Sequence, residues 1–327
     1  MPPLDLASGS PAPRDASDLA GEFPEGKGEQ GSEFISLRGE AVVGDAAMTG
    51  TMPPAAIGHP LPAPKGDAIA LEYAEPWTWQ CLPSGLIYHS YLAGAREPRF
   101  ASQWVYDRTQ GALWDVTLGG RVGIFRYGTE DRLGPEGFQL DMEGAAFPRL
   151  DMGQSEDLKA VDFRFGIPLT YGIGPYQTKL AYYHICSHLG DEFMLKNPDV
   201  ERINYVRNGF TWGNSYFWTP NVRLYAEAAW CYDTDGGAKP WEFQFGAEYS
   251  PARPTGKRPV PFVAVNGHLR EELNYSGNLV VQTGYQWRGE TNHLFRAGLH
   301  YYTGKSDQYE FFRQYEDKVG LGLWYDF

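Results

Sequence analysis

The densest group of side chains that could do chemistry lies in residues 182–192, which read Tyr-Tyr-His-Ile-Cys-Ser-His-Leu-Gly-Asp-Glu. If this stretch is a strand to about residue 188, then His184, Cys186 and His188 share the inward face and Ser187 points the other way. Residues two apart on one face of a strand can touch, so either imidazole could activate the Cys186 thiol. A thiol nucleophile paired with a histidine base is therefore geometrically possible here.

Two carboxylates follow at once, and Asp191 or Glu192 could orient the imidazole. A zinc site that uses both histidines is not expected, because a strand rises about 3.3 Å per residue and separates His184 from His188 by about 13 Å. No cofactor or metal is expected. The alternative interpretation is that histidines and a small cysteine simply pack within a polar lumen.

These residues belong to one of about twelve segments in which apolar and polar residues alternate with a period of two. In the last segment, Val319, Leu321 and Leu323 form an apolar row, whereas Gly320 and Gly322 fall on the opposite face. Gly, Pro, Asn and Asp separate the segments, as turn residues do. The predicted strands are approximately residues 99–106, 112–126, 136–147, 159–170, 176–188, 203–217, 221–232, 240–250, 259–269, 277–288, 293–303 and 317–327.

This pattern predicts an all-β fold, a closed antiparallel transmembrane barrel of about 12 strands of the outer-membrane type. A soluble β-sandwich also alternates, but its water-exposed face would carry more Lys and Glu than the Gly, Gln, Arg and Asp found here. The apolar face is also rich in Tyr and Trp, which suit the interfacial girdles of a membrane barrel. No stretch of 18 apolar residues occurs, so a transmembrane helix is excluded.

If the apolar rows face lipid, the opposite rows line the lumen and carry both signs of charge. In so narrow a barrel, carboxylates and guanidiniums are expected to meet in paired networks that stiffen the wall. The column formed by Asn266, His268 and Arg270 could alternatively border a solute path or hold an anionic head group. The predicted lumen-lining residues are Asp115, Arg121, Asp141, Glu143, Asp162, Arg164, Arg207, Arg223, Glu227, Glu242, Glu248, His268, Arg270, Arg288, Arg296 and His300.

Composition divides the chain of 327 residues unevenly. Residues 1–65 hold 10 of the 24 prolines and only two of the 49 aromatic residues (10 Trp, 21 Tyr and 18 Phe). Such a segment cannot bury enough apolar surface to offset the entropy of ordering, so a disordered tail is expected. Residues 66–98 are expected to form a plug or a periplasmic cap, and residues 99–327 the barrel. No basic or apolar leader follows Met1, so no signal peptide is visible.

The net charge of −13 argues against a nucleic-acid partner, which would need a positive face. The cysteines Cys81, Cys186 and Cys231 are odd in number and lack metal-type spacing. They therefore indicate neither a disulfide framework nor a zinc site.

The end of the chain resembles the C-terminal assembly signal of outer-membrane barrels, through Lys318, Gly320, Leu323, Tyr325 and the final Phe327. Beyond that, the stretch from about residue 91 to the end contains the motifs Tyr91-Leu-Ala-Gly94, Glu97-Pro-Arg99, Glu143-Gly-Ala-Ala-Phe-Pro-Arg149, Ser187-His-Leu-Gly-Asp-Glu192, Trp241-Glu-Phe-Gln-Phe-Gly-Ala-Glu-Tyr249, Val265-Asn-Gly-His-Leu-Arg270 and Leu323-Trp-Tyr-Asp-Phe327. Through these motifs it resembles a bacterial family named for domain of unknown function 1207 (DUF1207). That resemblance implies a fold and a location but no activity.

We expect a bacterial outer-membrane protein without catalytic activity, either a narrow porin-like channel or a structural barrel. The alternative is an acyl hydrolase that resembles lipid A deacylase barrels, which have a His-x-Ser pair where this chain has His184 and Cys186. A third interpretation is a surface or periplasmic anchor. The expected partners are the lipid bilayer, the outer-membrane assembly machinery, and a lipid or small solute.

Overall fold

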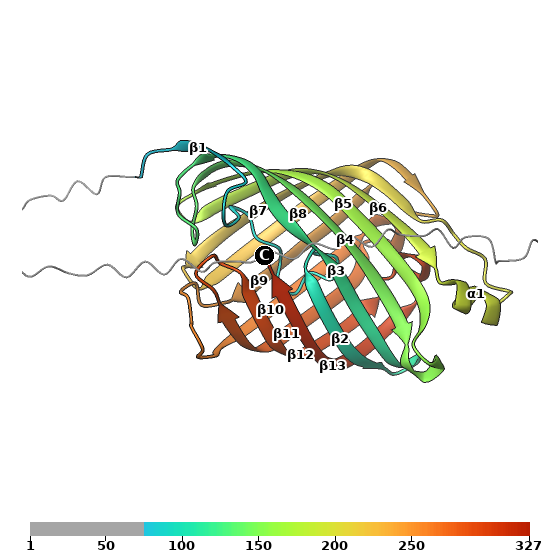
Figure 1. The fold of residues 1–327 in the computed structure, drawn as a ribbon. Coiled ribbons are helices and arrows are strands. Elements are labelled where there is room, and N and C mark those ends of the chain that lie inside the picture. The colour runs from blue at the N-terminus through green and yellow to red at the C-terminus, as the bar shows by residue number, and fades with distance from the viewer. Residues whose placement is uncertain (1–74) are drawn as a thin grey trace, which may run out of the picture. The chain divides into compact units, whose positions relative to one another are not determined.

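The computed structural model describes residues 75–327, and the tail expected over residues 1–65 lies outside them. Twelve long strands, β2 to β13, follow one another around a single antiparallel sheet, and β13 pairs with β2 to close it. Figure 1 shows this barrel from the side, with the short strand β1 at one end and helix α1 at the other. The predicted closed antiparallel barrel of about twelve strands is confirmed.

Each predicted segment corresponds to one barrel strand, and no strand end differs from its prediction by more than four residues. The strands are β1 (Thr78–Cys81), β2 (Phe100–Asp107), β3 (Gly111–Gly128), β4 (Gly137–Asp151), β5 (Asp157–Ile173), β6 (Tyr176–Leu189), β7 (Val206–Thr219), β8 (Val222–Asp235), β9 (Trp241–Tyr249), β10 (Val260–Arg270), β11 (Ser276–Arg288), β12 (Leu294–Lys305) and β13 (Tyr315–Asp326). The helical elements are α1 (Asp191–Lys196) and the 3-10 turns η1 (Met152–Gln154), η2 (Glu271–Leu273) and η3 (Tyr309–Phe311).

The last strand shows how alternation becomes a wall with two faces. Val319 and Leu321 of β13 are 56% and 60% exposed on the outer surface, whereas Lys318 and Trp324 are buried inside the barrel. Successive side chains of a strand point to opposite faces, so a period-two sequence gives an apolar outside and a polar inside. The outer surface of the barrel is therefore built from side chains that a soluble protein would hide.

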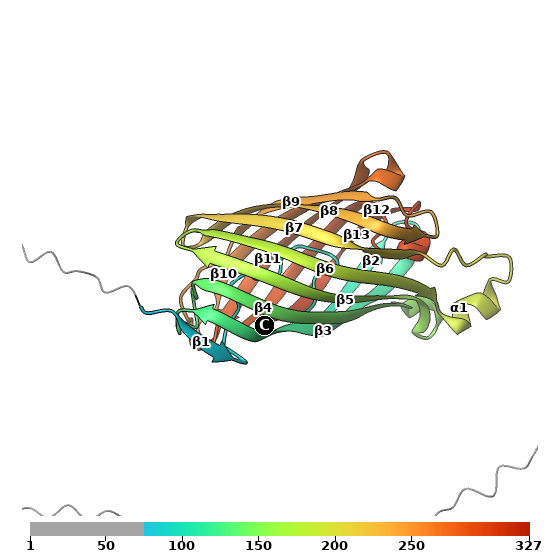
Figure 2. The same ribbon diagram turned by 90° about the horizontal axis from the view of Figure 1, so that it is seen from above.

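The two ends of the barrel differ in their connections. At the end where the chain terminates, here called the C-terminal mouth, two-residue turns join β5 to β6 and β7 to β8. At the other end, the α1 mouth, the connection between β6 and β7 spans residues 190–205 and contains α1 (Figure 2). No helix within residues 75–327 is long and apolar enough to cross a bilayer.

A buried ion network ties the strands together inside the α1 mouth. The guanidinium of Arg149 pairs with Asp115 at 2.6 Å, Glu316 at 2.5 Å and Asp307 at 2.9 Å, and its side chain is fully buried. Lys318 adds a second cation, 3.0 Å from Asp115 and 3.2 Å from Asp307. Burial alone would raise the pKa of Asp307, in the β12–β13 loop, but the surrounding Lys318, Arg96 and Arg149 hold that pKa well below its ordinary value.

We expect Arg149→Met to destabilise the folded barrel by about 3–5 kcal/mol, because Asp115, Glu316 and Asp307 then share Lys318 as their one remaining cation in this network. Urea unfolding of the refolded protein in detergent micelles measures this loss. The matched control is Arg108→Met, whose exposed side chain pairs with Asp317 and should lose less than about 1 kcal/mol. Equal losses for the two variants would contradict the role given to the network.

Candidate functional site

A segment without regular secondary structure, residues 82–98, is called the inner segment, and it lies inside the barrel from residue 86 onward. Such a chain must satisfy its backbone polar groups without a ladder of its own. Arg99 donates to the carbonyl oxygens of Tyr91 at 2.5 Å and Leu92 at 2.7 Å, and Arg296 donates to Leu92 at 3.1 Å. Arg121 donates to the Tyr88 carbonyl oxygen at 2.8 Å. Arginines at the barrel wall therefore supply hydrogen bonds to the enclosed backbone.

Two tyrosines of the inner segment connect it to the opposite wall. The Tyr91 ring stacks on Tyr225 of β8 with centroids 3.9 Å apart, and its hydroxyl donates to Glu227 at 2.9 Å. The Tyr88 hydroxyl lies 2.7 Å from that of Tyr91, and Lys179 pairs with Glu227 at 2.7 Å. Both tyrosines are fully buried, so the segment fills its part of the lumen with aromatic side chains.

The inner segment also carries a histidine next to this contact. Burial, with the nearby Arg223 and Arg288, lowers the pKa of His89 to about 3, so the imidazole is neutral at physiological pH. Arg223 of β8 donates a hydrogen bond to the backbone carbonyl oxygen of His89 at 3.0 Å. The histidine therefore adds no charge to the lumen.

The structure places the sixteen predicted lumen-lining residues on the inner wall, and most of them meet in pairs. The contacts are Arg121 and Arg164 with Glu143, Arg207 and His268 with Glu242, Arg223 with Glu248, Arg296 with Asp326, Asp115 with Arg149, Asp162 with Arg96, Glu227 with Lys179, Asp141 with Gln139, Arg270 with the Ser306 carbonyl oxygen, His300 with Gln282, and Arg288 with Ser250. Sequence reasoning missed Arg96, Lys179 and Asp307, because they lie on a loop or on a strand with an inverted pattern.

That inverted pattern is in β6, where the prediction that His184, Cys186 and His188 face the lumen is wrong. The buried, inward row contains Tyr183 and Ile185, and the two histidines and the cysteine lie on the partly exposed outer row. The reason is local packing. Inward apolar residues of β6 pack against Tyr205, Tyr309 and Phe312, which the loops bring into the α1 mouth. This local apolar cluster beside β6 reverses the usual polarity of the strand.

The other predicted site residues of this stretch are separated from the histidines. Ser187 points inward, where its hydroxyl donates to Asp162 and accepts from the Glu310 backbone N–H at 3.2 Å. Asp191 and Glu192 form the exposed first turn of α1, and no hydrogen bond to either imidazole is found among residues 75–327. These three residues therefore do not join the cluster.

A different residue does join His184 on the outer surface. Asn208 of β7 lies directly opposite His184 in the sheet, and its Oδ1 accepts a 2.7 Å hydrogen bond from the imidazole Nδ1. The Asn208 amide donates in turn to Asp233 of β8 at 2.9 Å, and the Tyr182 hydroxyl donates to Asn208 at 3.2 Å. Cys186 lies two residues along the same row as His184.

This outer cluster has the parts of a thiol nucleophile, a base and a group that orients the base. An Asn that binds Nδ1 fixes the tautomer in which Nε2 is free to accept a proton, as in cysteine–histidine–asparagine sites. Sequence reasoning missed Asn208 because it is distant in sequence, and only the β6–β7 register brings it to His184. Within residues 75–327, no three His, Cys, Asp or Glu side chains are grouped as metal ligands.

Cysteine labelling tests the inverted register of β6. In detergent micelles we expect maleimide to react with Cys186 on the outer surface, and to react with the buried Cys231 at least about a hundredfold more slowly. Mass spectrometry of timed samples gives both rates, and the exposed Cys81 is the internal control. Protection of Cys186 equal to that of Cys231 would contradict the outward orientation.

Solved structures with a similar arrangement are distant from this chain. Outer membrane phospholipase A from Escherichia coli is 11% identical over 73% of this chain and 93% of that chain, with a TM-score of 0.45. The corresponding phospholipase of Salmonella typhi, a dimer with bound calcium, is 11% identical over 73% and 91%, with a TM-score of 0.44. A mutant porin of Rh. blastica is 9% identical over 70% and 98%, with a TM-score of 0.27. Neither an activity nor a ligand follows from similarity at this level.

No curated protein sequence matches the chain. The family model described as protein of unknown function (DUF1207) matches residues 66–327, which include the whole barrel and the inner segment. The chain therefore belongs to the DUF1207 family.

Proposed function

We propose that this protein is an integral barrel of the bacterial outer membrane whose lumen is closed by the inner segment, so that it does not conduct. The outer surface supports the membrane position, since rows such as Val319 and Leu321 expose large apolar side chains. The lipid bilayer and the outer-membrane assembly machinery are then its partners, and the terminal Phe327 fits the assembly signal.

One observation supports the proposal that the lumen is closed. Arginines donate hydrogen bonds to the backbone of the inner segment and hold it in place. Its backbone binds Arg99, Arg121 and Arg296, which come from the start of β2, from β3 and from β12. A cavity of about 620 Å³ lies at the C-terminal mouth, where His89, Arg223 and Arg288 line it, but the cavities beside residues 94–99 are small. Two of them have a volume of about 20 Å³ each, which is room for about one water molecule. A porin-like path would need a lumen that water fills from mouth to mouth.

Conductance in planar lipid bilayers tests this proposal. We expect no stable unitary steps from the wild type, and steps from the double variant Arg99→Ala with Arg296→Ala, which removes three hydrogen bonds to the inner segment. Arg108→Ala, at an exposed surface ion pair, is the matched control and should stay silent. Steady steps from the wild type would refute the closed lumen, and a silent but folded double variant would refute the role of the arginines.

A second candidate function is acyl hydrolysis at the outer surface, and the hydrogen bond between His184 and Asn208 specifically favours it. Tyr182, Phe210 and Tyr232 form an aromatic group on the same surface, which would place the cluster at the membrane interface, where lipid ester bonds lie. In this reaction His184 takes the proton of Cys186, and the thiolate attacks the ester carbonyl. The alcohol leaves with that proton and a thioester forms. Water, deprotonated by His184, then releases the fatty acid and restores the thiol.

Release of fatty acid from phospholipid vesicles measures this activity. We expect Cys186→Ala and His184→Ala to reduce the rate to background, and Asn208→Ala to lower it about tenfold or more through loss of the correct tautomer. Cys81→Ala, at the exposed cysteine of β1, is the control and should keep the full rate. The hydrolase candidate fails if the wild type releases no fatty acid, or if Cys186→Ala retains the wild-type rate.

A further inference from the structure

The barrel wall has a seam where β3 is longer than the strand beside it. Strand β2 pairs with β3 only as far as Leu118, and β1 covers the same edge only from Phe125 to Gly128. Between them, the edge of residues 119–123 pairs with β4 alone, apart from a bond that Leu82 donates to Ile124 at its end. A short stretch of backbone is therefore left without a neighbouring strand.

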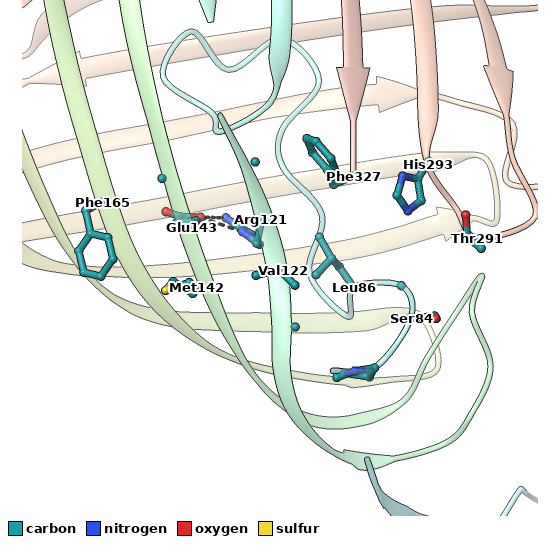
Figure 3. A pocket seen from close by; sticks show the side chains of 15 residues that line it. Ser84, Leu86, Arg121, Val122, Met142, Glu143, Phe165, Thr291, His293 and Phe327 are labelled. Carbon is teal, nitrogen blue, oxygen red and sulfur yellow. Dashed lines mark hydrogen bonds and ion pairs between the residues drawn. The ribbon is translucent and has the colours of Figure 1, made fainter. Parts of the chain in front are cut away.

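A groove of about 570 Å³ lies at this seam, within the size range of ligand pockets. Figure 3 shows it in close-up, with Leu86 and Phe327 on one side of β3, and Met142 and Phe165 on the other. Leu86 belongs to the inner segment and is only 5% exposed. The groove therefore connects the outer surface to a residue that lies within the barrel.

The outer border of the groove belongs to the apolar surface of the barrel. Val122, Met142 and Phe165 are 44%, 46% and 42% exposed and point outward. At its inner end, Arg121 and Glu143 pair with each other, so no free charge of this pair faces the groove. An apolar groove that continues the lipid-facing surface and ends at a neutralised ion pair suits a hydrocarbon chain.

Glycines keep the groove open where side chains would fill it. The Phe327 ring lies over Gly120, where an added Cβ would come within 2.8 Å of it. At Gly144 on β4 an added Cβ would meet nothing closer than 3.6 Å, so the space beside it is free. Phe327, together with the glycines Gly120 of β3 and Gly144 of β4, therefore shapes the groove.

We propose that this seam binds one acyl chain of a membrane phospholipid, which enters from the bilayer beside Phe327 and reaches Leu86. The inference rests on the proposed membrane position and adds a lateral lipid site to it. The groove continues the apolar outer surface at Val122, Met142 and Phe165, so an acyl chain that enters it keeps apolar contacts from the bilayer to Leu86.

Photo-crosslinking tests the site. The refolded full chain is inserted into phosphatidylcholine vesicles in which one acyl chain carries a diazirine, and crosslinked peptides are mapped by mass spectrometry. We expect crosslinks on outward residues around the barrel, such as Leu299, which is 55% exposed, and in addition on Leu86. Leu86 lines the groove and is otherwise buried, so a crosslink on it reports lipid inside the groove.

Gly144→Leu should fill the groove and reduce the Leu86 crosslink about tenfold or more, a loss of about 1.4 kcal/mol in binding. Ala226→Leu adds the same side chain on the outer face of β8, away from the seam, and should leave the crosslink unchanged. The wild-type pattern alone already decides the matter if Gly144→Leu does not fold. Crosslinks on Leu299 without Leu86 would overturn the lateral site alone, whereas crosslinks at neither residue would overturn the membrane position as well.

Discussion

The hydrogen bonds that arginines donate to the carbonyl oxygens of the inner segment are the interaction on which the interior of this barrel depends. Backbone groups enclosed without a ladder are costly unless a partner meets each of them. Arg99, Arg121 and Arg296 provide such partners while they also pair with carboxylates of the wall. One guanidinium can do both because its five N–H groups point in several directions. The lumen is thereby filled and its charge balanced with the same side chains.

The wall of the barrel was predictable from sequence to a large extent. Twelve alternating segments gave the strand number and approximate strand ends, because a two-sided wall imposes a period of two. The C-terminal strand was the clearest case, since Lys318 and Trp324 do face inward opposite Val319 and Leu321. The sequence did not show which carboxylates each arginine would meet. It also did not show that several arginines bind backbone carbonyls, because those bonds depend on a segment with no periodic pattern.

The candidate site was predictable only in part, and β6 shows why. The sequence identified His184 and Cys186 as candidates. The rule that the apolar face of every strand points outward, however, assigned them to the wrong face. That rule assumes that the lumen is polar throughout, and here Tyr205, Tyr309 and Phe312 make the part of it beside β6 apolar. Asn208 was missed because its contact with His184 depends on strand register, and nothing local in the sequence marks the residue as a partner.

The inner segment enters and leaves the barrel at the same end. It follows β1, which pairs with β3 at the C-terminal mouth, and it leads into Phe100, which pairs with Tyr325 at that mouth. It is a loop that enters the barrel and returns to the same mouth, and it does not pass through the barrel to the other mouth. Withdrawing it would break side-chain contacts and carbonyl hydrogen bonds but no pairing among β2 to β13. The strand pairing of the wall from β2 to β13 is therefore complete without the segment that fills the lumen.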